Sequence, residues 1–407
     1  MSRKLLKSAG LFAGAELFSK LINFGSFAAL AIWLTPEEYG LFAIAWLAFI
    51  AADAFFDLGG GISFFREEND AQSFRRFRGY VLCTGGFWFI VELAIAGGFY
   101  FSGRSDISIL VCLLALSLLP RIPLAAAQGW WKAQFKFERN AAVLLINAIA
   151  GSAAAIFAAS KGMGEIALAL RFVAGMVVSG VIALLIEPGL LTYAFCKRTF
   201  RSWATEGFKF SLTSNWGWLV FFYIEQQIIL YLMGTTALGI YNYAKKVVEI
   251  GLQALASITR ATILPYMIKR GINSVKLLKY TGICLLPLLT GVGMVQFVLS
   301  MPEFVNMVGG EWADVMPIAA IVVWVLPAGF VSTILSNYLV SAERYSALII
   351  IEIITTLLLL VVGLITFVYE YNLADFTFGI VTIQLVKAML VIYVTFEKAP
   401  DASAKEG

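Results

Sequence analysis

Positively charged side chains interrupt the long apolar stretches of this sequence at seven positions. An arginine guanidinium presents a planar fork that suits two phosphate oxygens, and a lysine presents a compact point charge. Charge within such stretches is costly and usually faces a cavity or a partner. We therefore predict an anion site, built from Arg121, Arg260, Arg171, Lys245 and Lys20. The alternative is that a cation near the end of a stretch extends to lipid headgroups, which is how we interpret Lys246 and Lys387.

Carboxylates lie in the same stretches and indicate a second kind of chemistry, the reversible binding of a proton or a cation, which in a transporter would couple movement to an ion gradient. Glu225 lies in the segment FFYIEQQIIL with no cation within one turn of its own helix, so it can take up a proton or hold a cation. The alternative is a satisfied hydrogen bond between helices. Asp53 and Glu92 are further candidates for the coupling role. Two other acids lie four residues from a lysine and are expected to be neutralised by it: Glu16 beside Lys20, and Glu249 beside Lys245.

Other chemistry has little support in the sequence. There is no histidine, which removes the commonest metal ligand and general base. The chain has no Gly-x-x-x-x-Gly-Lys loop for ATP, and we expect neither an enzyme nor a bound cofactor, only possible coupling to H⁺ or Na⁺. The four cysteines are far apart and do not have ligand spacing: Cys83, Cys112, Cys196 and Cys284.

The composition indicates that lipid surrounds most of the chain. Hydrophobic residues make up 60% of the sequence and charged residues only 14%, with a mean hydropathy of +0.85. A soluble chain of this length carries roughly 25% charged residues. The chain therefore lacks the polar residues to cover a soluble surface, and we expect a membrane protein.

Apolar stretches near the roughly 20 residues that span a bilayer recur along the whole chain. They are continuously apolar and do not alternate with period two, so they predict helices rather than barrel strands. Twelve spans are expected, at 9–34, 40–62, 79–102, 106–128, 141–160, 164–186, 207–233, 238–266, 276–300, 312–340, 345–369 and 373–395.

The distribution of positive charge gives the orientation. With a cytoplasmic N-terminus, 21 of the 30 Lys and Arg residues lie in cytoplasmic segments, and only Arg104 and Lys161 lie in outer ones. Cytoplasmic loops carry the excess of positive charge, so both termini are expected to be cytoplasmic. The predicted anion site then has cations at two depths: Arg121 and Arg260 toward the cytoplasm, Arg171 and Lys245 toward the outer side.

An internal sequence repeat divides the chain into two lobes. A shift of 199 positions places Gly40 on Gly239 and the first stretch, EEYGLFAIA, on the second, TALGIYNYA. Each stretch lies at an outer joint between the first two spans of a six-span half. We therefore expect two parallel repeats, as in transporters with the substrate site between lobes: 1–186, a cytoplasmic linker at 187–206, and 207–407.

An aromatic and basic segment, WWKAQFKFER at 130–139, is predicted to lie in the plane of the cytoplasmic surface. Aromatic side chains favour the headgroup level, and cations meet anionic lipid phosphates there. A nucleic-acid surface would need a soluble face, which this chain lacks.

Six motifs in order resemble bacterial polysaccharide flippases of the Wzx type, in the superfamily that also contains lipid II flippases and MATE multidrug exporters. They are LTPEEYGLFAIA at 34–45, DLGGGISF at 57–64, QGWWKAQFKFERNA at 128–141, MGTTALGIYNYAKKV at 233–247, ILPYM at 263–267 and GGEWADVMPI at 309–318. One departure from the family is Thr35, where the family usually has glycine.

The resemblance implies a MATE-like fold around a central cavity and a flippase for undecaprenyl-diphosphate-linked oligosaccharide in the inner membrane of a bacterium. It also implies polysaccharide polymerase and chain-length proteins as possible partners. Two alternatives remain open. A multidrug exporter of the same fold predicts a compact acidic pocket, and a membrane glycosyltransferase or polymerase needs a large outer loop with catalytic acids.

Overall fold

The computed structural model describes the backbone at residues 3–57, 64, 70–134, 136–258, 274–299, 312–341 and 344–397. All secondary structure in these ranges is helical. The chain forms two compact units, Met1–Trp216 and Gly217–Gly407, which we call the N-terminal and the C-terminal unit. The predicted linker at 187–206 ends before this division, which falls inside a helix.

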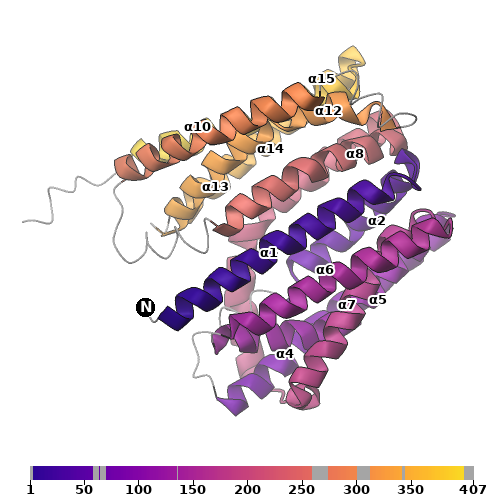
Figure 1. Cartoon of the computed structure of the whole chain (residues 1–407), viewed down its shortest axis with the longest axis vertical. Coiled ribbons are helices and arrows are strands. Elements are labelled where there is room, and N and C mark those ends of the chain that lie inside the picture. The colour runs from indigo at the N-terminus through magenta and orange to yellow at the C-terminus, as the bar shows by residue number, and fades with distance from the viewer. Residues whose placement is uncertain are drawn as a thin grey trace, which may run out of the picture. The chain divides into compact units, whose positions relative to one another are not determined.

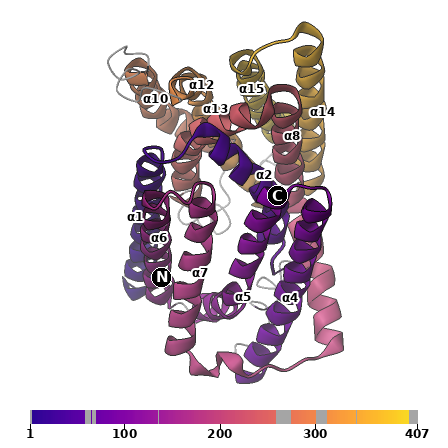
Figure 2. The ribbon, with the colours of Figure 1, turned by 90° about the vertical axis from the view of Figure 1, so that its right-hand side faces the viewer.

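Helices of the N-terminal unit pack side by side and are listed here with their bounds: α1 (Arg3–Leu30), α2 (Pro36–Ala54), α4 (Ala71–Phe101), α5 (Ser105–Ala133), α6 (Phe137–Ser160) and α7 (Ile166–Ile186). Helix α6 packs against α1 and α7, α7 also packs against α5, and α5 packs against α4 and α2. Figure 2 shows this succession from α1 through α6, α7 and α5 to α4. A short 3₁₀ helix, η1 (Pro188–Leu191), follows α7.

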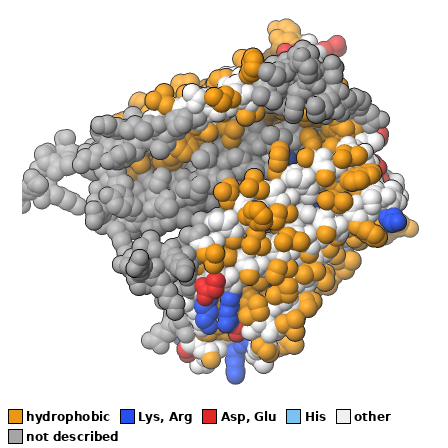
Figure 3. Space-filling view, in the orientation of Figure 1, with side chains coloured by type: hydrophobic (Ala, Val, Ile, Leu, Met, Phe, Trp, Pro, Cys, Tyr) orange, Lys and Arg blue, Asp and Glu red, His pale blue; other side chains and the backbone are white. Residues whose placement is uncertain are grey.

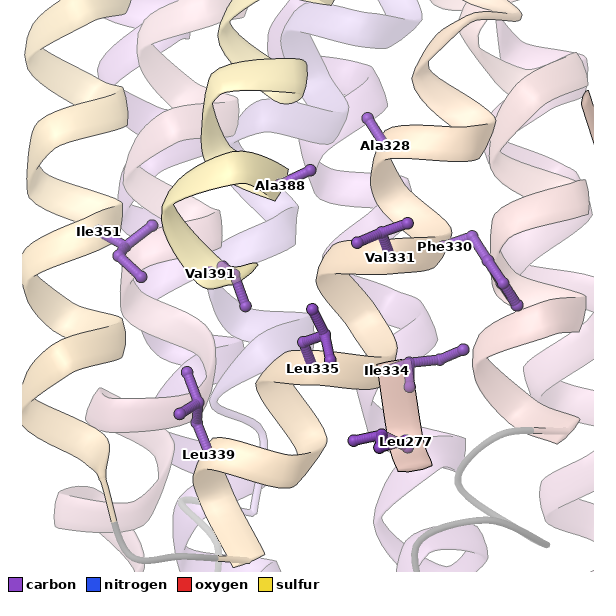
Figure 4. Close-up of a cluster of buried hydrophobic side chains, with 10 residues drawn as sticks. All are labelled: Leu277, Ala328, Phe330, Val331, Ile334, Leu335, Leu339, Ile351, Ala388 and Val391. Atoms are coloured by element: carbon purple, nitrogen blue, oxygen red, sulfur yellow. The ribbon is translucent and has the colours of Figure 1, made fainter. Parts of the chain in front are cut away.

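The second half begins with α8 (Lys197–Ile258) and continues with α10 (Ser274–Leu299), α12 (Val315–Val322), α13 (Val325–Ser341), α14 (Tyr345–Tyr369) and α15 (Leu373–Glu397), labelled in Figure 1. Figure 4 shows ten buried hydrophobic residues of the C-terminal unit where α10, α13, α14 and α15 meet. Among them, Leu335, Leu339 and Val391 are fully buried.

The chain doubles back inside α8 at Gly234, the position that the repeat pairs with Thr35. Gly234 has φ 88° and ψ −179°, which is not helical. The Asn242 side chain donates a hydrogen bond of 2.6 Å to that of Gln226. In one continuous helix these residues would lie about 24 Å apart. Residues on the two sides of Gly234 therefore form a helical hairpin, as the expected spans 207–233 and 238–266 require.

The helices have the length and composition of membrane-spanning helices. Among the described residues, eight stretches are long and apolar enough to cross a membrane, and one of them, 219–246, contains the turn at Gly234. With α1, α2 and α10, the helices fit the expected all-α architecture of about twelve spans. Figure 3 shows a broad hydrophobic surface on the N-terminal unit, with charged side chains gathered near its ends.

Helix ends differ from the predicted spans where local polar groups set them. Helix α2 begins at Pro36 because Thr35 and Glu38 form a reciprocal capping box, with the Thr35 N–H donating to the Glu38 carboxylate over 2.7 Å. Helix α4 begins eight residues before the expected 79, because Asp70 accepts a hydrogen bond of 2.6 Å from the Ser73 N–H.

A proline explains why the predicted span 312–340 is broken in two. The ring of Pro327 clashes with the carbonyl four residues earlier, at Val323, and proline has no N–H to donate. Helices α12 and α13 are accordingly separated at residues 323–324. The Trp324 indole at this break donates a hydrogen bond of 2.8 Å to Gln296.

The expected in-plane aromatic segment is wrong. Helix α5 runs on through Trp130 and Trp131 to Ala133, and α6 begins at Phe137. Trp131 is fully buried, and the Trp130 ring stacks on Phe74 with centroids 4.3 Å apart. The Trp130 ring therefore packs α5 against α4, and the Trp131 indole donates a hydrogen bond of 3.2 Å to Glu187 after α7.

We expect Gly234→Ala to destabilise the hairpin. No atom lies within 4 Å of a Cβ built at this position, so the cost comes from the backbone, whose φ of +88° is strained for any residue with a side chain. The expected loss in the free energy of unfolding is about 1–3 kcal/mol, measured by SDS titration of the purified protein in mixed micelles.

Gly291→Ala is the matched control, because a Cβ there also meets open space and its backbone is helical. This substitution is expected to be neutral or slightly stabilising, since alanine favours a helix over glycine. Equal stability of both variants would contradict the assignment of Gly234 as the turn.

Candidate functional site

A buried arginine lies in the interior of the N-terminal unit. Arg171 of α7 is 7% exposed, and its Nη2 donates hydrogen bonds to the Asn23 side chain (2.7 Å) and backbone carbonyl (3.2 Å) on α1. Its guanidinium carbon lies 4.1 Å from the centre of the Phe27 ring. Arg171 makes no ion pair with any carboxylate in the described part of the chain, and Nη1 has no hydrogen-bond partner there. Its charge is therefore oriented, and no described carboxylate neutralises it.

Small residues allow α7 to approach closely enough for this arrangement. A Cβ at Gly151 of α6 would lie 2.6 Å from the carbonyl oxygen of Arg171, and one at Gly175 would lie 3.0 Å from that of Asn147. Close contact through glycine is the usual means by which helices pack in lipid. The backbone of Arg171 is thus held by α6, while its side chain is held by α1.

Arg121, the other arginine of this unit that we predicted for the anion site, is neutralised. Arg121 of α5 forms an ion pair with Asp53 near the end of α2, and its other terminal nitrogen donates to the Asp53 carbonyl over 3.3 Å. The Phe56 ring centre lies 4.5 Å from the guanidinium carbon. Sequence reasoning assigned Asp53 to ion coupling and Arg121 to anion binding, and the structure joins the two in one pair. Each therefore has a structural partner in this conformation.

Arg121 and Arg171 lie at two levels of the N-terminal unit. A Cβ at Gly180 of α7 would lie 2.5 Å from the carbonyl oxygen of Pro120, the residue before Arg121 on α5. Arg121 therefore lies at the level of Gly180. Arg171 is nine residues earlier in α7, which is about 14 Å along the helix axis. The sequence predicted cations at two depths in the membrane, and the depths of Arg121 and Arg171 and their roles in an anion site stay predictions.

Glu92 of α4 is fully buried and has no hydrogen-bond partner in the described part of the chain. It is 0% exposed, and neither carboxylate oxygen has a hydrogen-bond partner among the described residues. A Cβ at Gly85 would touch the side chains of Ile122 and Phe56, which places Gly85 beside the Asp53–Arg121 pair. Glu92 lies seven residues further along α4, about 10 Å from that level. The isolated buried carboxylate that the sequence suggested for Glu225 is therefore found here.

Lys20 has the partner that its spacing predicted. Its Nζ lies 3.2 Å from Glu16, four residues earlier on α1, and both side chains are largely buried. The prediction of a Glu16–Lys20 pair is confirmed. A direct role for Lys20 in anion binding stays a prediction.

The interpretation of Glu225 as an unpaired carboxylate is wrong. Glu225 is 1% exposed, and it accepts hydrogen bonds from Lys245 and from the Tyr241 hydroxyl, both beyond the turn at Gly234. The Lys245 ammonium also lies 4.8 Å from the centre of the Phe222 ring. The hairpin thus brings together two residues that we assigned to different roles, and they neutralise each other.

The remaining charged candidates have mixed outcomes. Lys387 of α15 pairs with Glu352 of α14 at 2.5 Å, so it does not simply extend to lipid headgroups. Arg260 and the side chain of Glu249 lie outside the described residues, and their predicted roles stay predictions. Sequence reasoning missed Tyr241 and Asn23 as partners, because nothing along their own helices links them to Glu225 or Arg171.

We expect the two single substitutions at the Glu225–Lys245 pair to be costly and the double substitution to be mild. Lys245→Gln strands a carboxylate in the bilayer, so it should lower the free energy of unfolding by about 3–5 kcal/mol, and Glu225→Gln should cost less because Lys245 is 20% exposed. The double variant should recover most of the loss, measured by SDS titration of all four proteins.

The Glu16–Lys20 pair supplies the control cycle, because it joins neighbouring turns of one helix and should couple by less than about 1 kcal/mol. Additive losses in the Glu225–Lys245 cycle would show that the two charges do not depend on each other.

Comparison with known proteins gives the family and the fold. The profile of the family described as "Polysaccharide biosynthesis protein" matches residues 5–270. No significant match is found among curated protein sequences. Among solved structures, an inward-facing MATE multidrug resistance transporter of the MOP superfamily superposes with a TM-score of 0.72 at 13% identity, covering 95% of this chain and 97% of its own.

Two further structures extend the comparison. The lipid II flippase MurJ in an inward closed conformation has a TM-score of 0.70 at 13% identity, over 94% of this chain and 87% of its own. A MOP superfamily transporter from Pyrococcus furiosus, described as having a binding pocket of reverse polarity, has a TM-score of 0.67 at 15% identity, over 96% and 94%. At these identities the likeness shows the fold, and the family profile covers more than half of the sequence. The chain is therefore a multi-pass membrane protein with the MOP superfamily fold, and it belongs to the polysaccharide biosynthesis protein family.

Proposed function

We propose that this protein is a flippase that moves undecaprenyl-diphosphate-linked oligosaccharide across the bacterial inner membrane by alternating access. The observation that carries the proposal is Arg171, a buried cation without a carboxylate partner among the described residues. A charge held inside the membrane at such cost is usually functional. A diphosphate would supply the missing negative charge, and the family indicates a role in polysaccharide biosynthesis.

The geometry of Arg171 suits a phosphate oxygen. Asn23 holds Nη2 and Phe27 covers one face of the guanidinium, so the orientation of the fork is set before a ligand arrives. Nη1 has no described partner and is available as a donor. Because the side chain is only 7% exposed, we infer that a ligand reaches it in a more open conformation. Arg121 would join the site only if its pair with Asp53 opened.

The direction of transport and its energy source are part of the proposal. The sugar headgroup would enter at the cytoplasmic face, where the charge distribution places both termini, and leave at the periplasmic face. An H⁺ or Na⁺ gradient would drive the cycle. Glu92 replaces Glu225 as the preferred coupling residue, since a carboxylate without a partner is cheaper to hold in the membrane when a proton neutralises it. Asp53 becomes a second candidate for the coupling role when Arg121 leaves their ion pair to contact the substrate.

We expect Arg171→Gln to reduce flipping of the lipid-linked oligosaccharide in proteoliposomes by tenfold or more. A hydrogen bond to a charged group contributes about 1.5–3 kcal/mol, and every 1.4 kcal/mol is a factor of ten in binding. Arg171→Lys should recover part of the activity, because the charge remains while the fork is lost. Flipping is measured as protection of the glycan from an enzyme added outside the vesicles.

The matched control is Arg104→Gln, since Arg104 is half exposed and lies near Asp106 at one end of the unit. It should flip normally. Normal flipping by Arg171→Gln would contradict the proposal. Transport of organic cations instead of the lipid-linked glycan by the parent protein would favour the multidrug exporter, and glycan polymerisation would favour the enzyme.

Coupling is tested with the same vesicles under an imposed pH or Na⁺ gradient. Glu92→Gln mimics the neutral carboxyl with nearly the same shape, so it should flip at a rate that no longer depends on the gradient. The parent should respond to one of the two gradients. An unchanged response in Glu92→Gln would exclude Glu92 and return attention to Asp53 and Glu225.

A further inference from the structure

One face of α2 carries an aromatic cluster together with the acid of the Asp53–Arg121 pair. Phe42, Trp46, Phe49 and Asp53 recur at intervals of four, three and four residues, so they share one face of the helix. Trp46 and Asp53 are seven residues apart, which is about 10 Å along the helix axis. We call the side chains of Trp46, Asp53 and Arg121 the α2 patch. All three belong to the N-terminal unit.

The ion pair of the patch meets water beside a spanning helix. Arg121 lies 16 residues after the first residue of α5 and 12 before the last, about 24 Å and 18 Å along its axis. Helix α5 is long and apolar enough to cross a membrane, yet the side chain of Asp53 is 41% exposed. An ionised carboxylate is costly against lipid near the middle of such a helix, so its exposed part faces water.

Helix α2 as a whole is an interior helix. From Glu38 to Ala54 every residue is buried or half-buried, and none is fully exposed as the lipid-facing residues of a helix would be. It packs against α5, α4 and α7. The partly exposed side chains of Trp46 and Asp53 therefore border a water-accessible space and not the lipid.

Trp46 is held rigidly by other aromatic rings. Its centroid lies 4.6 Å from that of Phe172 on α7 and 5.3 Å from that of Phe49 on α2. Both neighbours fix the indole, and Trp46 still remains partly exposed. A fixed aromatic surface therefore lies on the same face of α2 as the ion pair.

The charges of the patch cancel, which favours a neutral polar ligand over an ion. Arg121 donates hydrogen bonds to the carboxylate and to the carbonyl oxygen of Asp53. A carboxylate accepts about four hydrogen bonds and a guanidinium has five N–H donors, so the pair retains both kinds of group. Sugar hydroxyls also donate and accept, and the C–H face of a sugar ring packs on an aromatic ring. The patch therefore has the chemistry to bind sugars.

The α2 patch also lies next to the proposed anion site. Phe172, whose ring contacts Trp46, directly follows Arg171 in α7. Arg171 differs from the patch because it has no carboxylate partner among the described residues. A diphosphate bound by Arg171 would place the first sugar attached to it near Trp46 and later sugars near Asp53.

We propose that the α2 patch is a subsite for the glycan of the lipid-linked substrate, distinct from the anion site at Arg171. The Trp46 indole stacks on one sugar ring. The Asp53 carboxylate and the Arg121 guanidinium form hydrogen bonds with the hydroxyl groups of the next sugars. The pair does this while it remains closed, in contrast to the roles in anion binding and ion coupling. This inference rests on the proposed function.

Binding of two lipids to the purified protein in nanodiscs separates the two subsites. One lipid is the oligosaccharide-bearing lipid extracted from cells that lack the gene for this protein, and the other is undecaprenyl diphosphate without sugar. The ratio of their dissociation constants measures the preference for the glycan. The parent should prefer the first lipid. Trp46→Leu should reduce this preference about two- to tenfold while binding undecaprenyl diphosphate as the parent does.

Three further variants serve as controls. Trp33→Leu is the matched substitution, because Trp33 is 44% exposed in the turn after α1 and lies outside the patch, and it should leave both affinities unchanged. Trp46→Phe keeps an aromatic surface and should retain most of the preference. Asp53→Asn should lower the preference but bind undecaprenyl diphosphate at least as tightly as the parent, because Arg121 loses its counter-charge.

The outcomes distinguish this inference from the proposed function. A parent that binds both lipids equally, or a preference that Trp46→Leu leaves unchanged, would overturn the glycan subsite and leave the flippase proposal in place. Equal losses for both lipids in Trp46→Leu would also overturn it, since Trp46 would then serve packing or the polyprenyl chain. Failure of the parent to bind either lipid would contradict the flippase proposal itself.

Discussion

A charge inside a lipid bilayer must meet an opposite charge, hydrogen-bonding groups or water, and this constraint organises both units of the protein. Most of the described intramembrane charges meet it by pairing, as in Asp53–Arg121, Glu225–Lys245 and Glu352–Lys387. Arg171 meets it only partly, through the Asn23 amide and the Phe27 ring. A charged side chain that is paired has a structural partner, and one without a partner among the described residues can bind a ligand.

Helix packing decides where these charges can lie. Lipid tails are as apolar as leucine, so helices in a membrane gain little from hydrophobic burial and associate through close backbone contact. Gly151 and Gly180 provide that contact on the two sides of α7, against α6 and α5. Arg171 lies on α7 at the contact with Gly151, and Gly180 lies nine residues further along the same helix. These two glycines therefore help to set the position of Arg171, a cation without a carboxylate partner among the described residues.

The sequence predicted the fold well because its strongest signals are long and repeated. Continuous apolar stretches predicted the helices, and the 199-residue repeat placed Thr35 and Gly234 at equivalent joints, where the structure shows a helix cap and a turn. The helix ends depend on finer, local signals. They are the Thr35–Glu38 capping box, the Asp70 cap and Pro327, which breaks a span.

The charged sites were harder to predict, because spacing along one helix identifies only neighbours on that helix. The Glu16–Lys20 pair is of this kind and was predicted correctly. Glu225 and Lys245 are 20 residues apart and meet only because the chain turns at Gly234. Asn23 and Arg171 are 148 residues apart in the sequence. Their side chains meet because α6 packs against both of their helices, α1 and α7. Such partners depend on tertiary packing, which the apolar pattern does not specify.

The central claim is that Arg171 gives the N-terminal unit an affinity for the diphosphate of a lipid-linked substrate. Equilibrium binding of undecaprenyl diphosphate, compared with uncharged undecaprenol, to the purified protein at several salt concentrations tests this claim without requiring transport. The account predicts that the diphosphate binds at least tenfold more tightly than the alcohol, and that Arg171→Gln removes most of this difference while binding the alcohol normally. An undiminished preference for the diphosphate in Arg171→Gln would contradict the account and move the anion site elsewhere in the chain.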